Sequence, residues 1–187
     1  MQFGLSEEQS LLQESINRFL SNQVPLDEVR KIADGDKPES DVWTGLIDLG
    51  IPGLLISEAN GGLGLSSLDA AIVAEALGYH VTPSPYLSSA AIAPVVLQSA
   101  GKREGLLGGA AIGETRIGIA FTEGVGARRE TAVIAENGKL NGKSLFAMDA
   151  SADYYLVAMT ERQIYLVRAD ADGLERKPLA TVDRTQS

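Results

Sequence analysis

The chain has 187 residues, 44% of them hydrophobic and 22% charged, which is an ordinary globular composition with room for one large domain or two small ones. It contains no cysteine and one histidine, which excludes disulfides, thiolate or histidine-rich metal sites and a cysteine nucleophile, and its formal net charge of −9 argues against a nucleic-acid partner. No run approaches the roughly 18 apolar residues of a membrane span, and the start, MQFGLSEEQ, is not a secretory signal, so we expect a cytoplasmic protein with no metal and no membrane insertion.

Apolar residues recur at helical spacing as far as Gly113. Ser6 with Gln9 forms a capping box, in which the two side chains satisfy free backbone N–H groups, and Pro25 stops this first helix. Ser66 with Asp69 forms a second capping box before another helix, which Gly78 should close. Further helices are predicted at 26–33, about 41–49, 68–77, 88–99 with a kink or late start at Pro94, and 102–112.

The stretch SEANGGLGL, residues 57–65, is rich in glycine and precedes a helix. Glycine-rich turns at a helix N-terminus can hold phosphate, but they need a good strand before the glycines. The preceding IPGLLI is a poor strand, and no Gly-Lys-Ser/Thr follows. We therefore predict that the glycines form a corner, where positive φ and close backbone approach are needed.

From Thr115 the apolar period changes to two, which is typical of strands. The predicted strands are RIGIAFT, ETAVIAE, KLNGKSLFAM, DYYLVAMT and QIYLVRA, with a hairpin turn at Asn137-Gly138 and a tight turn at TERQ. We predict an α+β fold: an N-terminal all-α helical bundle domain, 1–113, followed by an antiparallel β-barrel-like domain, 114–187. Its strands should include Ile117–Phe121 and Tyr154–Ala158. The polar ending ATVDRTQS has no terminating element, so we expect an incomplete second domain.

Five stretches in register resemble the acyl-CoA dehydrogenase family, the flavoenzymes that introduce a 2,3-double bond into acyl-CoA thioesters. These are LSEEQSLLQESINRFL, LIDLGIPGLLISEANGGLGLSSLDAAIVAEALG, IAFTE, KLNGKSLFAMDASADYYLVA and PLATVDRTQ. The resemblance implies FAD as cofactor, an acyl-CoA substrate, an electron-accepting flavoprotein and a homo- or hetero-oligomer. It also implies that a C-terminal helical bundle, beyond Ser187, carries the catalytic glutamate, so no catalytic residue is expected within this chain.

The resemblance places flavin-binding residues in two segments. In IAFTE, Thr122 keeps the family's hydroxyl, and Ile119 and Phe121 fall where residues contact the ring. In the hairpin, Phe146 replaces the usual tryptophan and can still pack flat on a ring. Met148 replaces the usual threonine and cannot donate a hydrogen bond from its side chain.

Other polar and aromatic residues have ordinary interpretations beside functional ones. Arg128 and its neighbour Arg129 either meet a CoA phosphate or carboxylate, or form a solvated turn; both readings stay open. His80 follows a helix C-terminus and is expected to be a cap and not a base. Trp43 and Phe19 lie on apolar helix faces and are expected in the core.

Three functions are therefore open. The first is the N-terminal portion of a flavin-dependent acyl-CoA dehydrogenase. The second is a non-catalytic subunit of a heteromeric dehydrogenase that shapes a shared half-site, which the changes at Phe146 and Met148 motivate. The third is a structural or interaction module. Composition alone indicates only a two-part globular protein.

Overall fold

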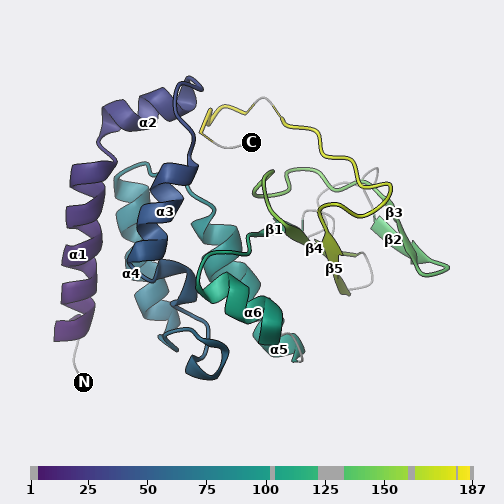
Figure 1. Ribbon diagram of the computed structural model, residues 1–187, viewed down its shortest axis with the longest axis horizontal. Helices are drawn as coiled ribbons and strands as arrows, with labels where there is room; N and C mark the ends of the chain where they lie inside the picture. The colour runs from purple at the N-terminus through teal and green to yellow at the C-terminus, as the bar shows by residue number, and fades with distance from the viewer. Residues whose placement is uncertain (1–3, 102–103, 122–132, 160–162, 180, 186–187) are drawn as a thin grey trace.

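The computed structural model describes residues 4–101, 104–121, 133–159, 163–179 and 181–185. Helices make up one side of the molecule and strands the other, and the segment after the last strand runs back across the strand side towards α2 (Figure 1). The α-helices are α1 (Glu7–Gln23), α2 (Leu26–Ala33), α3 (Ser40–Asp48), α4 (Ser67–Tyr79), α5 (Ala93–Ala100) and α6 (Glu104–Ala111). Short 3-10 turns, η1 (Ile51–Gly53) and η2 (Glu58–Asn60), and a π-helix, η3 (Tyr86–Ile92), connect them.

Both predicted capping boxes are present and both start a helix. Ser6 accepts from the Gln9 backbone N–H at 3.1 Å while the Gln9 side chain accepts from the Ser6 N–H at 3.1 Å. At α4 the backbone N–H of Ser66 donates to the Asp69 carboxylate at 2.8 Å. Residues 26–33 form a helix with the predicted bounds.

Two helix predictions are corrected. Gly78 does not end α4, which continues to Tyr79 with His80 as its C-cap; the left-handed residue that turns the chain away is Val81, at φ 51°. The predicted helix at 88–99 is instead the π-helix η3 followed directly by α5, so Pro94 lies in the first turn of a new helix, where its missing N–H has no cost.

The strands form two small sheets and no closed barrel among the described residues. One sheet has the order β1 (Ile117–Ala120), β4 (Tyr154–Ala158) and β5 (Ile164–Arg168), and the other is a hairpin of β2 (Val133–Glu136) and β3 (Lys139–Gly142). The predicted Asn-Gly turn joins β2 to β3, with Asn137 at φ 52° and Gly138 at φ 75°. The TERQ turn falls largely on 160–162, outside the described residues.

The prediction of an antiparallel sheet is wrong for β1 and β4. Ile117 pairs with Tyr154 and Ala120 with Val157, so these two strands run parallel, whereas β4 and β5 are antiparallel. The alternation of apolar residues fixes which faces are buried but not the direction of the partner strand. A long connection that includes the β2–β3 hairpin makes the parallel pairing possible.

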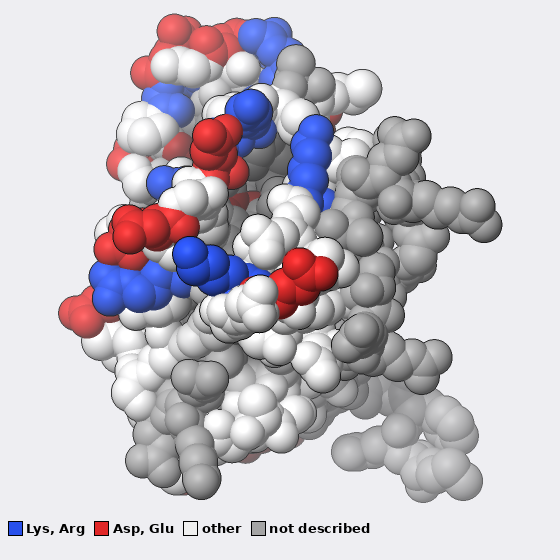
Figure 2. Space-filling model, turned by 90° about the vertical axis from the view of Figure 1, so that its right-hand side faces the viewer, with Lys and Arg blue, Asp and Glu red and all other residues white. Residues whose placement is uncertain are grey.

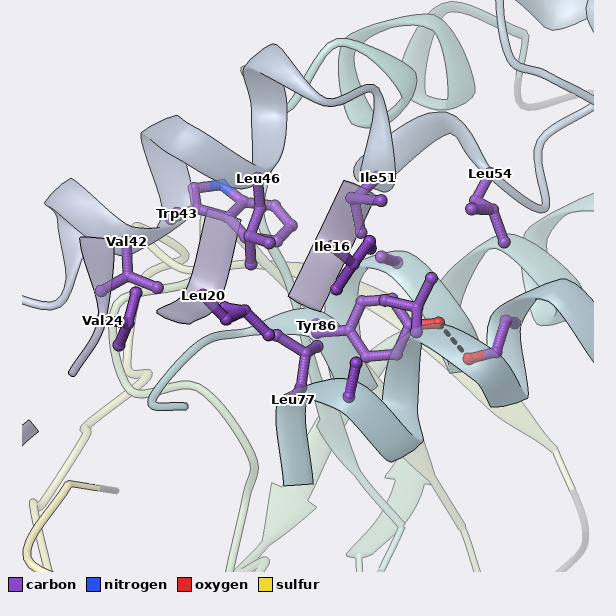
Figure 3. Close-up of a cluster of buried hydrophobic side chains, with 14 of the residues drawn as sticks. Ile16, Leu20, Val24, Val42, Trp43, Leu46, Ile51, Leu54, Leu77 and Tyr86 are labelled. Carbon is purple, nitrogen blue, oxygen red and sulfur yellow. Dashed lines mark hydrogen bonds between the residues drawn. The ribbon is translucent and has the colours of Figure 1, made fainter. Parts of the chain in front are cut away.

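Two hydrophobic cores stabilise the fold. The first is built from α1 to α4, η1 and η3, and includes Leu20 and Leu46. Trp43 lies in this core, as predicted, and Phe19 packs against it. Within it the Tyr86 hydroxyl donates to the Ala70 carbonyl at 2.7 Å (Figure 3), and burial raises the pKa of this phenol. The second core joins α5 and α6 to β1 and β4, so helices and strands share one apolar interior.

The glycine-rich stretch 57–65 is a corner, as predicted. Gly61 and Gly64 have positive φ, at 82° and 63°. The N–H groups of Leu63, Gly64 and Leu65 donate to carbonyls of the preceding turn, at 2.9, 2.7 and 2.9 Å. These donors are therefore used within the chain and are not available to hold a phosphate.

The α4 capping box makes stability depend on pH. Hydrogen bonds from Ser66, side chain first, lower the pKa of Asp69 against the opposing effect of burial. Its carboxylate therefore stabilises the folded state above the ordinary aspartate pKa of about 4, and this contribution is lost as the pH falls through the lowered folded pKa. In urea titrations, Asp69→Asn should lower the free energy of unfolding at pH 7 by about 1 kcal/mol, and the difference from wild type should shrink towards pH 3. The exposed Glu75→Gln on the same helix is the control; an equal pH dependence in both variants would contradict the prediction.

Within the described part of the chain, no helix is both long and apolar enough to cross a membrane. On the face shown in Figure 2, described Lys and Arg side chains alternate with Asp and Glu, and they form no continuous basic surface.

Candidate functional site

The two segments that resemble flavin-binding segments meet in the structure. The Ile119 N–H donates to the Met148 carbonyl at 3.2 Å, and the Met148 N–H donates to the Ile119 carbonyl at 2.9 Å. This is an isolated antiparallel bridge beside the parallel β1–β4 pair. Side chains of Met148 and Phe121 pack against the second core, in which Ile119 is buried.

Of the remaining predicted site residues, the structure describes only Phe146. Phe146 lies in the left-handed region at φ 56°, and the residue is 56% exposed. An exposed flat ring beside Met148 fits a role in packing on an aromatic ligand. Thr122 and Arg128 lie outside the described residues.

The bridge requires a glycine on β1. A Cβ on Gly118 would lie 2.5 Å from the Tyr155 ring and 2.8 Å from the Met148 carbonyl oxygen, both closer than real side chains allow. On the helical side, the Ser89 hydroxyl of η3 accepts from the Ile117 N–H at 2.9 Å and donates to the Ile117 carbonyl at 3.3 Å. β1 is therefore fixed between the π-helix and the segment that contains Met148.

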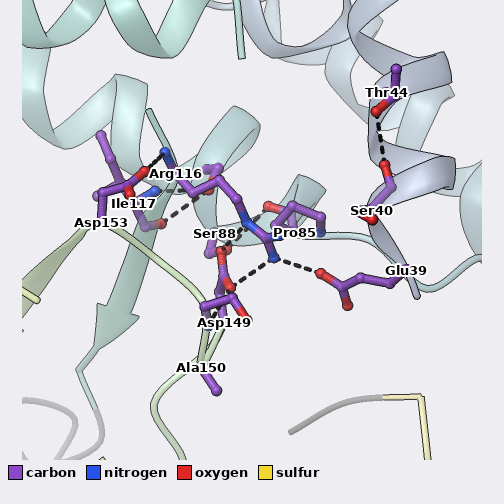
Figure 4. Close-up of polar contacts among 12 residues, drawn as sticks. Glu39, Ser40, Thr44, Pro85, Ser88, Arg116, Ile117, Asp149, Ala150 and Asp153 are labelled. Atoms are coloured by element: carbon purple, nitrogen blue, oxygen red, sulfur yellow. Dashed lines mark hydrogen bonds and ion pairs between the residues drawn. The ribbon is translucent and has the colours of Figure 1, made fainter. Parts of the chain in front are cut away.

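An ion-pair cluster surrounds Arg116, the residue immediately before β1 (Figure 4). Its guanidinium makes two hydrogen bonds to the Asp149 carboxylate, Nε to Oδ2 at 3.0 Å and Nη2 to Oδ1 at 2.8 Å. Nη2 also reaches Glu39 Oε1, at the start of α3, at 2.5 Å. The Arg116 backbone is fixed as well, since its N–H donates to Asp153 Oδ2 at 2.8 Å.

The electrostatics of this cluster are mutually stabilising. The Asp149 side chain is only 2% exposed and that of Arg116 17% exposed. Burial opposes the charge on Arg116, but the bonds and charges of Asp149 and Glu39 outweigh it and raise the pKa of the guanidinium. The Arg116 guanidinium therefore stays charged and paired with both carboxylates.

A cavity of about 320 Å³ lies beside the cluster. Leu87 and Ser88 of η3 line it from the helical side, and Met148 with the Arg116–Asp149 pair lines it from the strand side. Its walls thus come from both halves of the chain. Among the described residues, no three Asp, Glu or His side chains are grouped so that they could hold a metal ion.

The sequence resemblance named Ile119 and Met148, which the structure brings together, but not Arg116 and its two carboxylates. The available signal for this cluster was a single arginine directly before an apolar strand, because an arginine that is buried there needs an acidic partner. The partners themselves, Glu39 and Asp149, are far from it in the chain and no spacing rule connects them.

Comparison with known proteins identifies the family of the chain. The family model for the acyl-CoA dehydrogenase N-terminal domain matches residues 6–104, more than half of the chain. No curated protein sequence matches the chain significantly.

Solved structures match over nearly the whole chain. The ChsE4–ChsE5 complex from Mycobacterium tuberculosis is 25% identical with a TM-score of 0.82, covering 97% of this chain and 52% of the other. The Tcur3481–Tcur3483 steroid ACAD is 25% identical with a TM-score of 0.83, covering 96% and 53%. An acyl-CoA dehydrogenase complexed with FAD from Bacillus anthracis is 20% identical with a TM-score of 0.74, covering 98% and 35%. The chain therefore spans about half the length, or less, of these three structures.

Proposed function

Because this chain belongs to the acyl-CoA dehydrogenase family, we propose that the complete protein is a flavin-dependent dehydrogenase that forms an α,β-double bond in an acyl-CoA thioester. The observation that carries the proposal is the backbone bridge between Ile119 and Met148. It brings together the two segments whose sequences resemble flavin-binding segments, although they lie far apart in the chain.

The residues present fit a flavin in part. Phe146 offers an exposed ring for packing, and the side chains of Phe121 and Met148 lie in or beside the second core, which supports the segment from behind. When bound, FAD supplies a hydride acceptor. The chain's own residues would position that ring and exclude water from one side of it. We further propose that the cavity between η3 and Met148 belongs to the wall of the acyl site.

The rest of the proposal extends beyond this chain. The α-proton would be removed by a carboxylate of a C-terminal bundle, and the reduced cofactor would be reoxidised by an electron-accepting flavoprotein. Division into a helical domain, 1–113, and a β domain, 114–187, is part of the same proposal, as is an oligomeric state.

A second candidate is a non-catalytic subunit of a heteromeric dehydrogenase. The Met148 thioether cannot donate a hydrogen bond, and its backbone N–H already donates to Ile119. This position therefore offers the flavin no donor. Two of the similar structures carry paired names, one of them described as a complex. A downstream bundle without a suitable carboxylate would favour this candidate over the first.

Thr122 tests the flavin site directly. We expect Thr122→Val in the complete protein to lower bound flavin, since losing one hydrogen bond to a buried polar ring costs about 1–3 kcal/mol. The measurement is the flavin-to-protein absorbance ratio after equilibration at limiting FAD. Thr44→Val is the matched control, because Thr44 is exposed on α3 and its hydroxyl bonds only its own helix. Equal flavin content in both variants would remove Thr122 from the site.

A further inference from the structure

Residues 146–149 adopt a backbone conformation that needs outside support. Phe146 at φ 56° and Asp149 at φ 67° are both left-handed, a region that residues other than glycine occupy only where the surroundings hold them. Between them lies Met148, whose N–H and carbonyl both pair with Ile119. The position of Met148 therefore depends on what fixes its neighbours.

Asp149 is the fixed end of this segment. Its carboxylate accepts two bonds from Arg116, at 3.0 and 2.8 Å, and one from the Ser151 N–H at 3.0 Å. Its carbonyl accepts from the Tyr155 hydroxyl at 2.9 Å. With a side chain only 2% exposed, Asp149 has no solvent alternative to these partners.

We propose that Arg116 is a positioning residue: its two-pronged contact with Asp149 holds residues 146–149 against β1 and so sets Phe146 and Met148 in place for the flavin. The placement for flavin rests on the proposed function; the contact with β1 does not. The bond from Arg116 to Glu39 ties the same side chain to the start of α3. The proposal requires that the position of Met148 does not depend on this second bond.

The chemistry of the two ion pairs supports different roles for Asp149 and Glu39. A planar guanidinium presents two parallel N–H donors that match the two carboxylate oxygens, whereas an ammonium group acts as a point charge without this fixed fork. Without Arg116, the buried Asp149 carboxylate would keep only the Ser151 N–H as a partner and would lose its counter-ion, and the chain would move to let it reach water. That movement would pull Met148 away from Ile119. Glu39, with 30% of its side chain exposed, can be rehydrated without such movement.

Three variants of the complete protein separate these roles: Arg116→Met, Arg116→Lys and Glu39→Gln. Backbone amide exchange of Met148 and Ile119 reports the contact with β1 and needs no flavin. Exchange should accelerate by about tenfold or more in Arg116→Met, by less in Arg116→Lys, and within about twofold of wild type in Glu39→Gln. Amides of Leu20 and Val73 in the first core should stay protected in all three, which shows that each variant is folded.

Flavin affinity, measured by absorbance titration of the apoprotein, should fall in the same order. Unchanged amide exchange at Met148 in Arg116→Met would overturn the proposal, whatever the flavin affinity of that variant. If the amides of the first core lose their protection in Arg116→Met, Arg116→Lys provides the same test. Faster exchange with unchanged flavin affinity would overturn the proposal that this segment sets Phe146 and Met148 in place for the flavin. A wild-type protein that binds no flavin would instead overturn the proposed function, while the exchange rates still decide whether Arg116 holds the segment.

Discussion

Replacing Gly62 by alanine is expected to destabilise the fold by about 3 kcal/mol, a large fraction of the stability of a small domain. A Cβ at this position would collide with the Ile56 carbonyl oxygen and lie 2.6 Å from the Gly53 carbonyl oxygen. Both are backbone atoms, so no side-chain rotation can relieve the overlap. The corner would have to open to make room for the Cβ. The same two carbonyls, of Ile56 and Gly53, accept the hydrogen bonds from the Gly64 and Leu63 N–H groups that close the corner.

The measurement is urea-induced unfolding followed by circular dichroism, and Gly78→Ala is the matched control. A Cβ at Gly78 meets nothing within 4 Å, and the residue lies inside α4. Alanine there should stabilise by up to about 1 kcal/mol, because glycine is the poorer helix former. Gly62→Ala as stable as wild type would show that the corner is not the close contact described.

The second large effect concerns activity. The 187-residue chain alone is expected to show no turnover of an acyl-CoA and to bind flavin poorly. Removing a carbon-bound proton next to a thioester needs a base within hydrogen-bond reach. Asp149, the described carboxylate adjacent to Met148, has a buried side chain whose two oxygens already accept hydrogen bonds from Arg116. The proposed base lies in a C-terminal bundle.

The assay follows an artificial electron acceptor after FAD and an acyl-CoA are added to the purified chain. The complete protein, assayed in parallel, is the positive control. Sustained turnover by the chain alone would contradict the account, because one of its own residues, such as Glu123 outside the described part, would then have to act as the base.

The sequence by itself determined the local elements of this protein. Capping boxes at Ser6 and Ser66, the stop at Pro25 and the Asn137-Gly138 turn each depend on residues a few positions apart, and all appear in the structure. Such features follow from hydrogen bonds and φ preferences within one turn of chain. The resemblance likewise identified Ile119 and Met148, which the structure brings together.

Only the tertiary structure decided the features that join distant segments. Alternating apolar residues do not encode strand direction, so the parallel pairing of β1 with β4 could not be read from them. Nor could spacing reveal that Arg116 would meet Glu39 and Asp149, or that Gly118 would face Tyr155 and the Met148 carbonyl. These contacts depend on where packing of the two cores places each backbone, and that is fixed by the whole chain and not by any short stretch of it.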